Sequence, residues 1–156
     1  MRITVLAVGT RMPGWVVTGI DTYRKRLPPH IKLEIVEISP GVRAARAPVA
    51  AAMEKEAEQL LKRAARADRV IALDERGKQW RSTGLAERMR GWQDEAADVA
   101  MLIGGADGLT DECRNRADAV WSLSQLTLPH ALVRVVLAEQ IYRASTILQG
   151  HPYHRE

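Results

Sequence analysis

Short apolar runs alternate with amphipathic stretches along this chain. The apolar runs predict five strands, at Ile3–Val8, Leu33–Ile38, Val70–Leu73, Val99–Ile103 and Ala119–Leu123. The amphipathic stretches predict five helices, at Trp15–Leu27, Val49–Ala67, Trp80–Trp92, Leu109–Arg116 and from Pro129 to about Gln149. Strands that alternate with helices indicate one α/β domain, in which helices cover both faces of a mostly parallel sheet.

Three segments that directly follow predicted strands are candidates for a ligand site. They are Leu73–Gly77, Ile103–Gly108 and Ser122–Leu128. Open α/β sheets bind ligands at the carboxyl ends of their strands, so we expect the three segments to meet there. The third segment carries Leu123, Leu126 and Leu128, a spacing that predicts a loop packed inside the protein. The expected site is therefore a pocket made mostly of backbone groups and apolar side chains.

The glycines of the second segment do not match a known nucleotide-binding motif. A dinucleotide fingerprint needs Gly-x-Gly-x-x-Gly after the first strand, whereas Gly104 to Gly108 reads Gly-Gly-Ala-Asp-Gly after a late strand. A phosphate-binding loop would need Gly-Lys-Ser or Gly-Lys-Thr, which does not follow. An NAD-dependent oxidoreductase and a phosphate-loop NTPase are both disfavoured. The glycines allow a close backbone approach to a ligand, or form a tight strand-to-helix turn.

Charge is unevenly distributed along the chain. The formal net charge is +4, and the first 50 residues hold eight Lys or Arg against three acids while the remainder nearly balances. A basic face on a neutral body suits a polyanion such as nucleic acid, although a solvated surface with a chance imbalance would look the same. Charge alone therefore favours a nucleic-acid partner only slightly.

The single cysteine and the apolar runs bear on compartment. One cysteine, Cys113, cannot form a disulfide framework within the chain, which fits a reducing compartment. Its polar surroundings, with no obvious base, predict a small, partly buried side chain rather than a nucleophile. The first apolar run is too short for a signal peptide, and none approaches the length of a membrane span. We expect a cytoplasmic protein.

The last residues combine histidines with a tyrosine. His151 and His154 are three apart, but no further ligand lies nearby at suitable spacing and Pro152 disfavours a helix, so metal binding is disfavoured. On composition alone the tail is either a frayed end or a functional segment.

Taken together, the motifs make the chain recognisable from end to end. They are Ala7–Thr10 with Trp15, Leu73-Asp74, Ile103–Gly105 with Gly108-Leu109, Leu123–His130, Arg134-Val135, Glu139–Ala144 and Pro152–Arg155. With these residues the chain resembles the ribosomal RNA large-subunit methyltransferase H family, the pseudouridine N3-methyltransferases of the SPOUT superfamily. Ala106-Asp107, where relatives often carry Pro and Glu, is a small departure within a turn.

The resemblance implies a fold and a cofactor that composition does not reveal. It implies a C-terminal segment threaded into a deep trefoil knot, an exception to the rule that chains are unknotted. It also implies S-adenosylmethionine bound in the knot, no metal, and an obligate homodimer. The cofactor contacts that the resemblance implies are Leu73, Gly104, Leu123, Ser124, Gln125, Leu126, Thr127 and Leu128. Leu73, Leu126 and Leu128 would sandwich the adenine ring.

Methyl transfer from a sulfonium to a base nitrogen needs in-line positioning, a dry pocket and removal of a proton. His154 or Tyr153 could accept that proton, or an arginine could stabilise the resulting anion. The expected nucleotide-handling group is Arg134, Tyr142, Tyr153, His154 and Arg155. Because a short tail has limited reach, we expect the tail of one protomer to complete a site of its partner.

The resemblance predicts a methyltransferase that modifies N3 of a pseudouridine in 23S rRNA, in the hairpin that meets the decoding region, on assembled 70S ribosomes. A small chain would then borrow its specificity from the ribosomal surface. The alternative is a non-catalytic ribosome-binding or assembly factor that uses the same basic first third. Calorimetry with S-adenosylmethionine separates the two, because the alternative predicts no binding.

Overall fold

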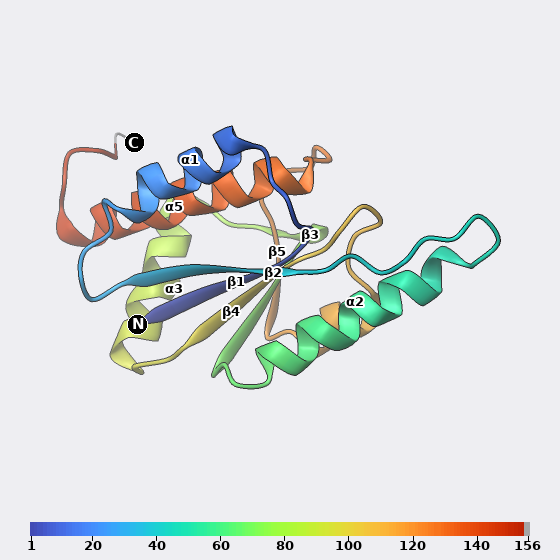
Figure 1. Cartoon of the computed structure of the whole chain (residues 1–156). Helices are drawn as coiled ribbons and strands as arrows, with labels where there is room; N and C mark the ends of the chain where they lie inside the picture. Colours follow the sequence, from blue (N-terminus) through green and yellow to red (C-terminus); the bar gives the residue numbers. More distant parts are fainter. Residues whose placement is uncertain (155–156) are drawn as a thin grey trace.

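The computed structural model of the chain describes residues 1–154 and shows a five-stranded sheet between two layers of helices (Figure 1). The strands are β1 (Arg2–Val8), β2 (Lys32–Ile38), β3 (Arg69–Gln79), β4 (Val99–Ile103) and β5 (Ala119–Ser122). The helices are α1 (Gly14–Arg24), α2 (Val49–Ala64), α3 (Ser82–Asp94), α4 (Asp111–Arg116) and α5 (His130–Gln149).

The sheet is parallel throughout, in the order β2-β1-β4-β3-β5. Alternate residues of β1 face opposite layers, as the two-residue period of a strand requires. Ile3 and Val5 pack in the core beneath α1, α3 and α5, whereas Leu6 and Val8 pack against α2 and α4. The predicted α/β class, with a mostly parallel sheet covered on both faces, is confirmed. The C-terminal knot that the resemblance implies stays a prediction.

Helix α5 begins and ends where the sequence indicates. Pro129 is its N-cap. A proline suits the start of a helix because the N–H groups there have no partner within the helix, so its missing N–H costs no hydrogen bond. Gly150 ends the helix at φ +67°, a left-handed conformation that glycine adopts without a side-chain clash. Buried apolar residues along the helix, including Leu137 and Ile141, fix it across the sheet beside α1 and α3.

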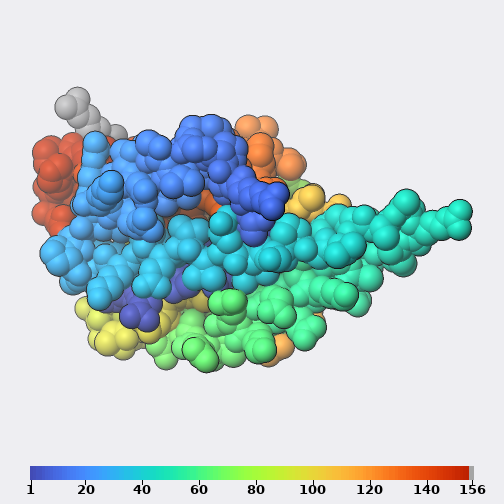
Figure 2. All heavy atoms as spheres, viewed as in Figure 1, coloured from blue at the N-terminus to red at the C-terminus, as the bar shows by residue number. Residues whose placement is uncertain are grey.

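The loop between β2 and α2 projects from the body. Figures 1 and 2 show this segment and the start of α2 extending beyond the rest of the molecule (teal). The β2–α2 loop (residues 39–48) is exposed along nearly all of its length. No helix within residues 1–154 is long and apolar enough to cross a membrane.

Candidate functional site

A cavity of about 570 Å³ lies at the carboxyl edge of the sheet, within the range of small-molecule sites. Its lining comes from residues 73–76, 103–109, Arg114, Trp121, 123–124, 126–130 and Val133. The three segments that the sequence singled out therefore meet, because parallel strands end at one edge. The structure adds Arg114, Trp121 and the first turn of α5 to them.

Close backbone packing shapes the glycine turn (residues 104–108). A Cβ on Gly104 would lie 2.4 Å from the carbonyl carbon of Gly108, so a larger residue would force the turn open. Gly108 has φ +80°, which few residues other than glycine adopt. The turn thus presents backbone groups to the cavity, and Gly104 lies where the sequence placed a cofactor contact.

Strand β3 is longer than predicted, which changes the second wall of the cavity. The predicted strand ended at Leu73, but β3 continues to Gln79 through an irregularity in which both Leu73 and Lys78 stand opposite Trp121. The residues between them bulge, and Asp74 and Glu75 line the cavity. A bulge of this kind re-aims side chains at a sheet edge. Leu73 lines the cavity as predicted.

Arg114 fastens this bulge to the glycine turn, and sequence reasoning missed it. Its Nη1 donates to Asp74 Oδ2 at 3.0 Å and to the carbonyl of Leu109 at 2.6 Å. Burial opposes the charged form, but hydrogen bonds with Asp111 and Asp74 outweigh it, so the pKa of Arg114 is raised and the guanidinium stays charged. The cavity lining therefore contains a carboxylate, Asp74, that is paired with a fixed cation.

The third wall is the loop after β5, and the prediction that this loop packs inside the protein was wrong. Leu123 and Leu128 are half-buried, but Leu126 is 73% exposed although it lines the cavity. Of the predicted contacts, Leu123, Ser124, Leu126, Thr127 and Leu128 line the cavity and Gln125 does not. The loop sits at the rim, where its polar groups are satisfied locally. It is not packed inside the protein.

Two hydrogen bonds hold that rim in place. The backbone N–H of Leu126 donates to Ser124 Oγ at 2.9 Å, and the hydroxyl of Thr127 donates to Glu75 Oε2 at 2.7 Å. The second bond joins the loop to the β3 bulge across 52 residues of sequence. The Trp121 indole, also in the lining, leaves its Nε1 buried without a hydrogen-bond partner among residues 1–154.

Arg134, which the sequence assigned to nucleotide handling, is an internal link between elements. It is 2% exposed, and its Nη1 donates to Glu37 Oε2 at 2.8 Å while its Nη2 donates to the carbonyl of Gly9 at 2.9 Å. These bonds tie α5 to the carboxyl ends of β1 and β2. Sequence reasoning did not single out Glu37, because nothing local relates it to a residue 97 positions away.

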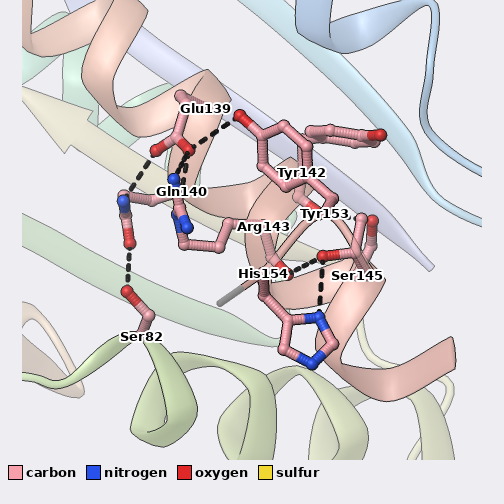
Figure 3. Close-up of polar contacts among 9 residues, drawn as sticks. Ser82, Glu139, Gln140, Tyr142, Arg143, Ser145, Tyr153 and His154 are labelled. Carbon is pink, nitrogen blue, oxygen red and sulfur yellow. Dashed lines mark hydrogen bonds and ion pairs between the residues drawn. The ribbon is translucent and has the colours of Figure 1, made fainter. Parts of the chain in front are cut away.

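The C-terminal tail packs against α5 of its own chain, as Figure 3 shows. The ring of Tyr153 meets Tyr142 edge-on, with centroids 4.7 Å apart, and its hydroxyl donates to Glu139 Oε1 at 3.1 Å. His154 Nδ1 lies 3.4 Å from the Thr146 hydroxyl. Tyr142, Tyr153 and His154 are thus brought together; Arg155 lies outside the described residues.

Burial, and after it the Glu139 carboxylate, raises the pKa of Tyr153. In this position the phenol therefore stays protonated and acts as a hydrogen-bond donor. His154 is the remaining candidate proton acceptor of the tail among the described residues.

The tail and the cavity lie towards opposite ends of α5. Val133 lines the cavity, whereas the tail contacts Glu139, Tyr142 and Thr146. At the standard rise per residue, the helix rises by about 9 Å from Val133 to Glu139 and by about 20 Å from Val133 to Thr146, the contact of His154. Within one chain the structure therefore does not bring the tail to the cavity, and it places Arg134 away from the tail as well.

Cys113 is fully buried, more so than predicted. Burial raises the pKa of its thiol, which opposes formation of a nucleophilic thiolate. Within residues 1–154 no group of three or more His, Cys, Asp or Glu side chains is placed to hold a metal ion.

Comparison with known sequences matches the chain to one family over almost its whole length. The model of a family described as "Predicted SPOUT methyltransferase" matches residues 1–154. A protein of Chromohalobacter salexigens named ribosomal RNA large subunit methyltransferase H is 52% identical, covering 99% of this chain and 100% of its own. A protein of the same name from Paraburkholderia phymatum is 49% identical and covers 99% of each chain.

Solved structures show the same fold at low sequence identity. A probable methylase family protein from Haemophilus influenzae has a TM-score of 0.63 at 12% identity, covering 99% of this chain and 70% of its own. A probable methyltransferase from Bordetella pertussis has a TM-score of 0.59 at 17% identity, covering 92% and 96%. A Legionella pneumophila protein described as a methyltransferase, in complex with the bound cofactor SAM, has a TM-score of 0.52 at 12% identity, covering 93% and 66%.

Proposed function

The chain belongs to the ribosomal RNA large-subunit methyltransferase H family of SPOUT methyltransferases, and we propose that it transfers a methyl group from S-adenosylmethionine to N3 of a pseudouridine in 23S rRNA. The observation that carries the proposal is the cavity at the carboxyl edge of the sheet. Its glycine turn, its leucines and its rim loop are the residues by which the chain resembles this family.

The lining of the cavity fits the proposed cofactor. The glycine turn lets backbone groups approach an adenine edge, and Leu73 and Leu128 offer apolar contact to its faces. Glu75 supplies negative charge for a cationic ligand, whereas Asp74 and Asp107 are paired with Arg114 and Arg43. When bound, S-adenosylmethionine would supply an electrophilic methyl group on a positively charged sulfur.

The protein's part in the reaction is to orient the base and remove one proton. The N3 proton of the uracil-type ring must leave before or during attack on the methyl group. We assign its acceptance to His154, because Tyr153 is held as a donor. Tyr142 positions the tail by its edge-on contact with Tyr153. Arg155 would stabilise the developing anion, and Arg134 would position the strands' carboxyl ends.

We further propose that each site is shared between two protomers of a homodimer. The support is the rise of about 20 Å along α5 between Val133, which lines the cavity, and Thr146, which His154 contacts in the same chain. If the two α5 helices pack side by side and run in opposite directions, a tail held on its own helix would lie beside the partner's cavity. The cavity would then receive His154 and Arg155 from the other copy.

The proposed substrate is the pseudouridine hairpin near the decoding region of an assembled ribosome. The excess positive charge in the first 50 residues suits an RNA surface. Incubation with methyl-labelled S-adenosylmethionine and 70S ribosomes, separate subunits or naked rRNA tests the proposal. We expect label on 23S rRNA in the 70S sample and little elsewhere. Label on none of the substrates, with no cofactor binding by calorimetry, would favour the non-catalytic ribosome-binding alternative.

A further inference from the structure

The β2–α2 loop contains two arginines that behave differently. From Ser39 to Met53 the chain has no acidic residue, and the loop extends from the body in Figures 1 and 2. Arg46 is exposed on this projecting segment. Arg43 instead reaches back to the body and contacts groups from three parts of the chain.

Those contacts use all three nitrogens of the Arg43 guanidinium. Its Nη1 donates to the carbonyl of Gly41 at 2.9 Å, its Nη2 to Glu56 Oε1 at 2.7 Å and its Nε to Asp107 Oδ2 at 2.9 Å. Gly41 belongs to the loop, Glu56 to α2 and Asp107 to the glycine turn. A planar guanidinium can bridge two carboxylates in this way, whereas a lysine ammonium cannot hold the same geometry.

Glu56 explains why this bridge matters for the glycine turn. Its side chain is 4% exposed, and a buried carboxylate is costly unless it is paired. A Cβ built on Gly105 would lie 3.3 Å from Glu56 Oε2, so the carboxylate lies directly behind the backbone of the turn. Hydrogen bonds with Glu56, and then with Asp107, raise the pKa of Arg43, so the bridging cation stays charged.

We propose that Arg43 is a positioning residue for the cofactor. It fixes the glycine turn through Asp107, which lines the cavity, and through Glu56, which lies behind the backbone of Gly105. Arg43 does not line the cavity, whereas Asp107 and Gly105 do. Cofactor affinity then depends on a side chain that does not touch the cofactor. The inference rests on the proposed function, because it takes S-adenosylmethionine as the ligand of this cavity.

A double-mutant cycle read by calorimetry with S-adenosylmethionine tests the route through Asp107. Arg43→Ala and Asp107→Asn should each weaken binding about tenfold, and the double variant should bind no more weakly than Arg43→Ala alone, because both changes break one network. Arg43→Lys should recover only part of the affinity. Arg46→Ala is the matched control in the same loop and should bind like the wild type.

The outcomes separate positioning from simple stabilisation. If Arg43→Ala lowers the melting temperature but binds the cofactor as tightly as the wild type, the proposal is wrong. Effects that multiply in the double variant to about a hundredfold would also contradict it, because the two residues would then act independently. A wild-type protein that binds no S-adenosylmethionine would instead overturn the proposed function. If Arg43→Ala does not fold, Glu56→Gln serves instead: it keeps the shape, and it should weaken binding several-fold, whereas unchanged affinity would contradict the proposal.

Discussion

The hydroxyl of Tyr153 donates a hydrogen bond to the Glu139 carboxylate at 3.1 Å, and this bond holds the C-terminal tail on the helix of its own chain. Tyr153 also contacts the Tyr142 ring edge-on, and the central carbon of the Arg143 guanidinium lies 5.1 Å from the centre of the Tyr153 ring. These contacts of the tail lie towards the C-terminal end of α5, and the cavity lies at its N-terminal end. The candidate catalytic groups and the candidate cofactor pocket of one chain are therefore apart.

Mixed dimers test whether two chains share each site. Gly104→Ala should disable the cavity and His154→Ala the tail, so each homodimer should be inactive. Co-expressed in equal amounts, half of the dimers would be mixed, and each mixed dimer would hold one intact cavity facing one intact tail. Labelled methyl transfer should then recover to about a quarter of the wild-type rate.

The same assay has a clear opposite result. If each site were formed within one chain, no mixture would contain an intact site and the rate would stay at background.

His154→Ala by itself should reduce turnover by about a hundredfold, in the range expected for loss of a general base, while cofactor affinity by calorimetry stays within about threefold. Unchanged turnover would remove His154 from the mechanism.

Gly104→Ala should abolish cofactor binding with little effect on folding outside the turn. The added Cβ would stand 2.4 Å from the Gly108 carbonyl carbon, so the backbone of the turn must move. Gly91→Ala in α3 is the matched control, because a Cβ there meets nothing within 4 Å and alanine favours a helix by about 1 kcal/mol. Calorimetry should find no binding for the first variant and wild-type affinity for the second.

Leu126→Ala should weaken cofactor binding and leave stability unchanged. The side chain is 73% exposed but lines the cavity, so a ligand bound there would complete its burial. Covering most of a leucine is worth about 1.5–3 kcal/mol, which corresponds to at least about a tenfold loss of affinity. Val42→Ala, which removes an 80% exposed side chain away from the cavity, should change neither quantity. A drop in the free energy of unfolding for Leu126→Ala would contradict this, because it would show that the side chain packs against the body of the protein without a ligand.

Arg134→Ala should lower the free energy of unfolding by about 3 kcal/mol, because it removes a buried guanidinium that links Glu37 to Gly9. Arg2→Ala is a useful comparison, since its pair with Glu34 is 3.9 Å long and half exposed, and such surface pairs contribute less than about 1 kcal/mol. Urea unfolding of both variants measures the difference. Lost turnover with unchanged stability would show that Arg134 acts on the substrate rather than on the fold.

Much of the fold could be predicted because its signals are local. The strand at Val99–Ile103 is a continuous apolar run and was predicted to the residue. Pro129 and Gly150 mark the two ends of α5 through properties of their own backbones. Alternation of these elements was enough to predict a parallel sheet between helices.

What the sequence did not reveal depends on partners far along the chain. The extension of β3 to Gln79 exists because Lys78 pairs with Trp121 on β5, and no pattern within residues 69–79 signals it. Arg114 and Glu37 owe their roles to Asp74 and Arg134, which are 40 and 97 positions away. The motifs shared with a known family were enough to locate the cavity. Only the fold shows that the C-terminal tail and the cavity of one chain lie apart.

Mass spectrometry of nucleosides from the 23S rRNA of 70S ribosomes, incubated with the protein and S-adenosylmethionine, tests the proposed reaction most directly. The ribosomes should come from cells that lack the native modification, and the His154→Ala variant serves as the control. We expect one new N3-methylated pseudouridine per ribosome, in the hairpin near the decoding region, with the wild-type protein and almost none with the variant. A methyl group on a different base, or no new methyl group, would contradict it.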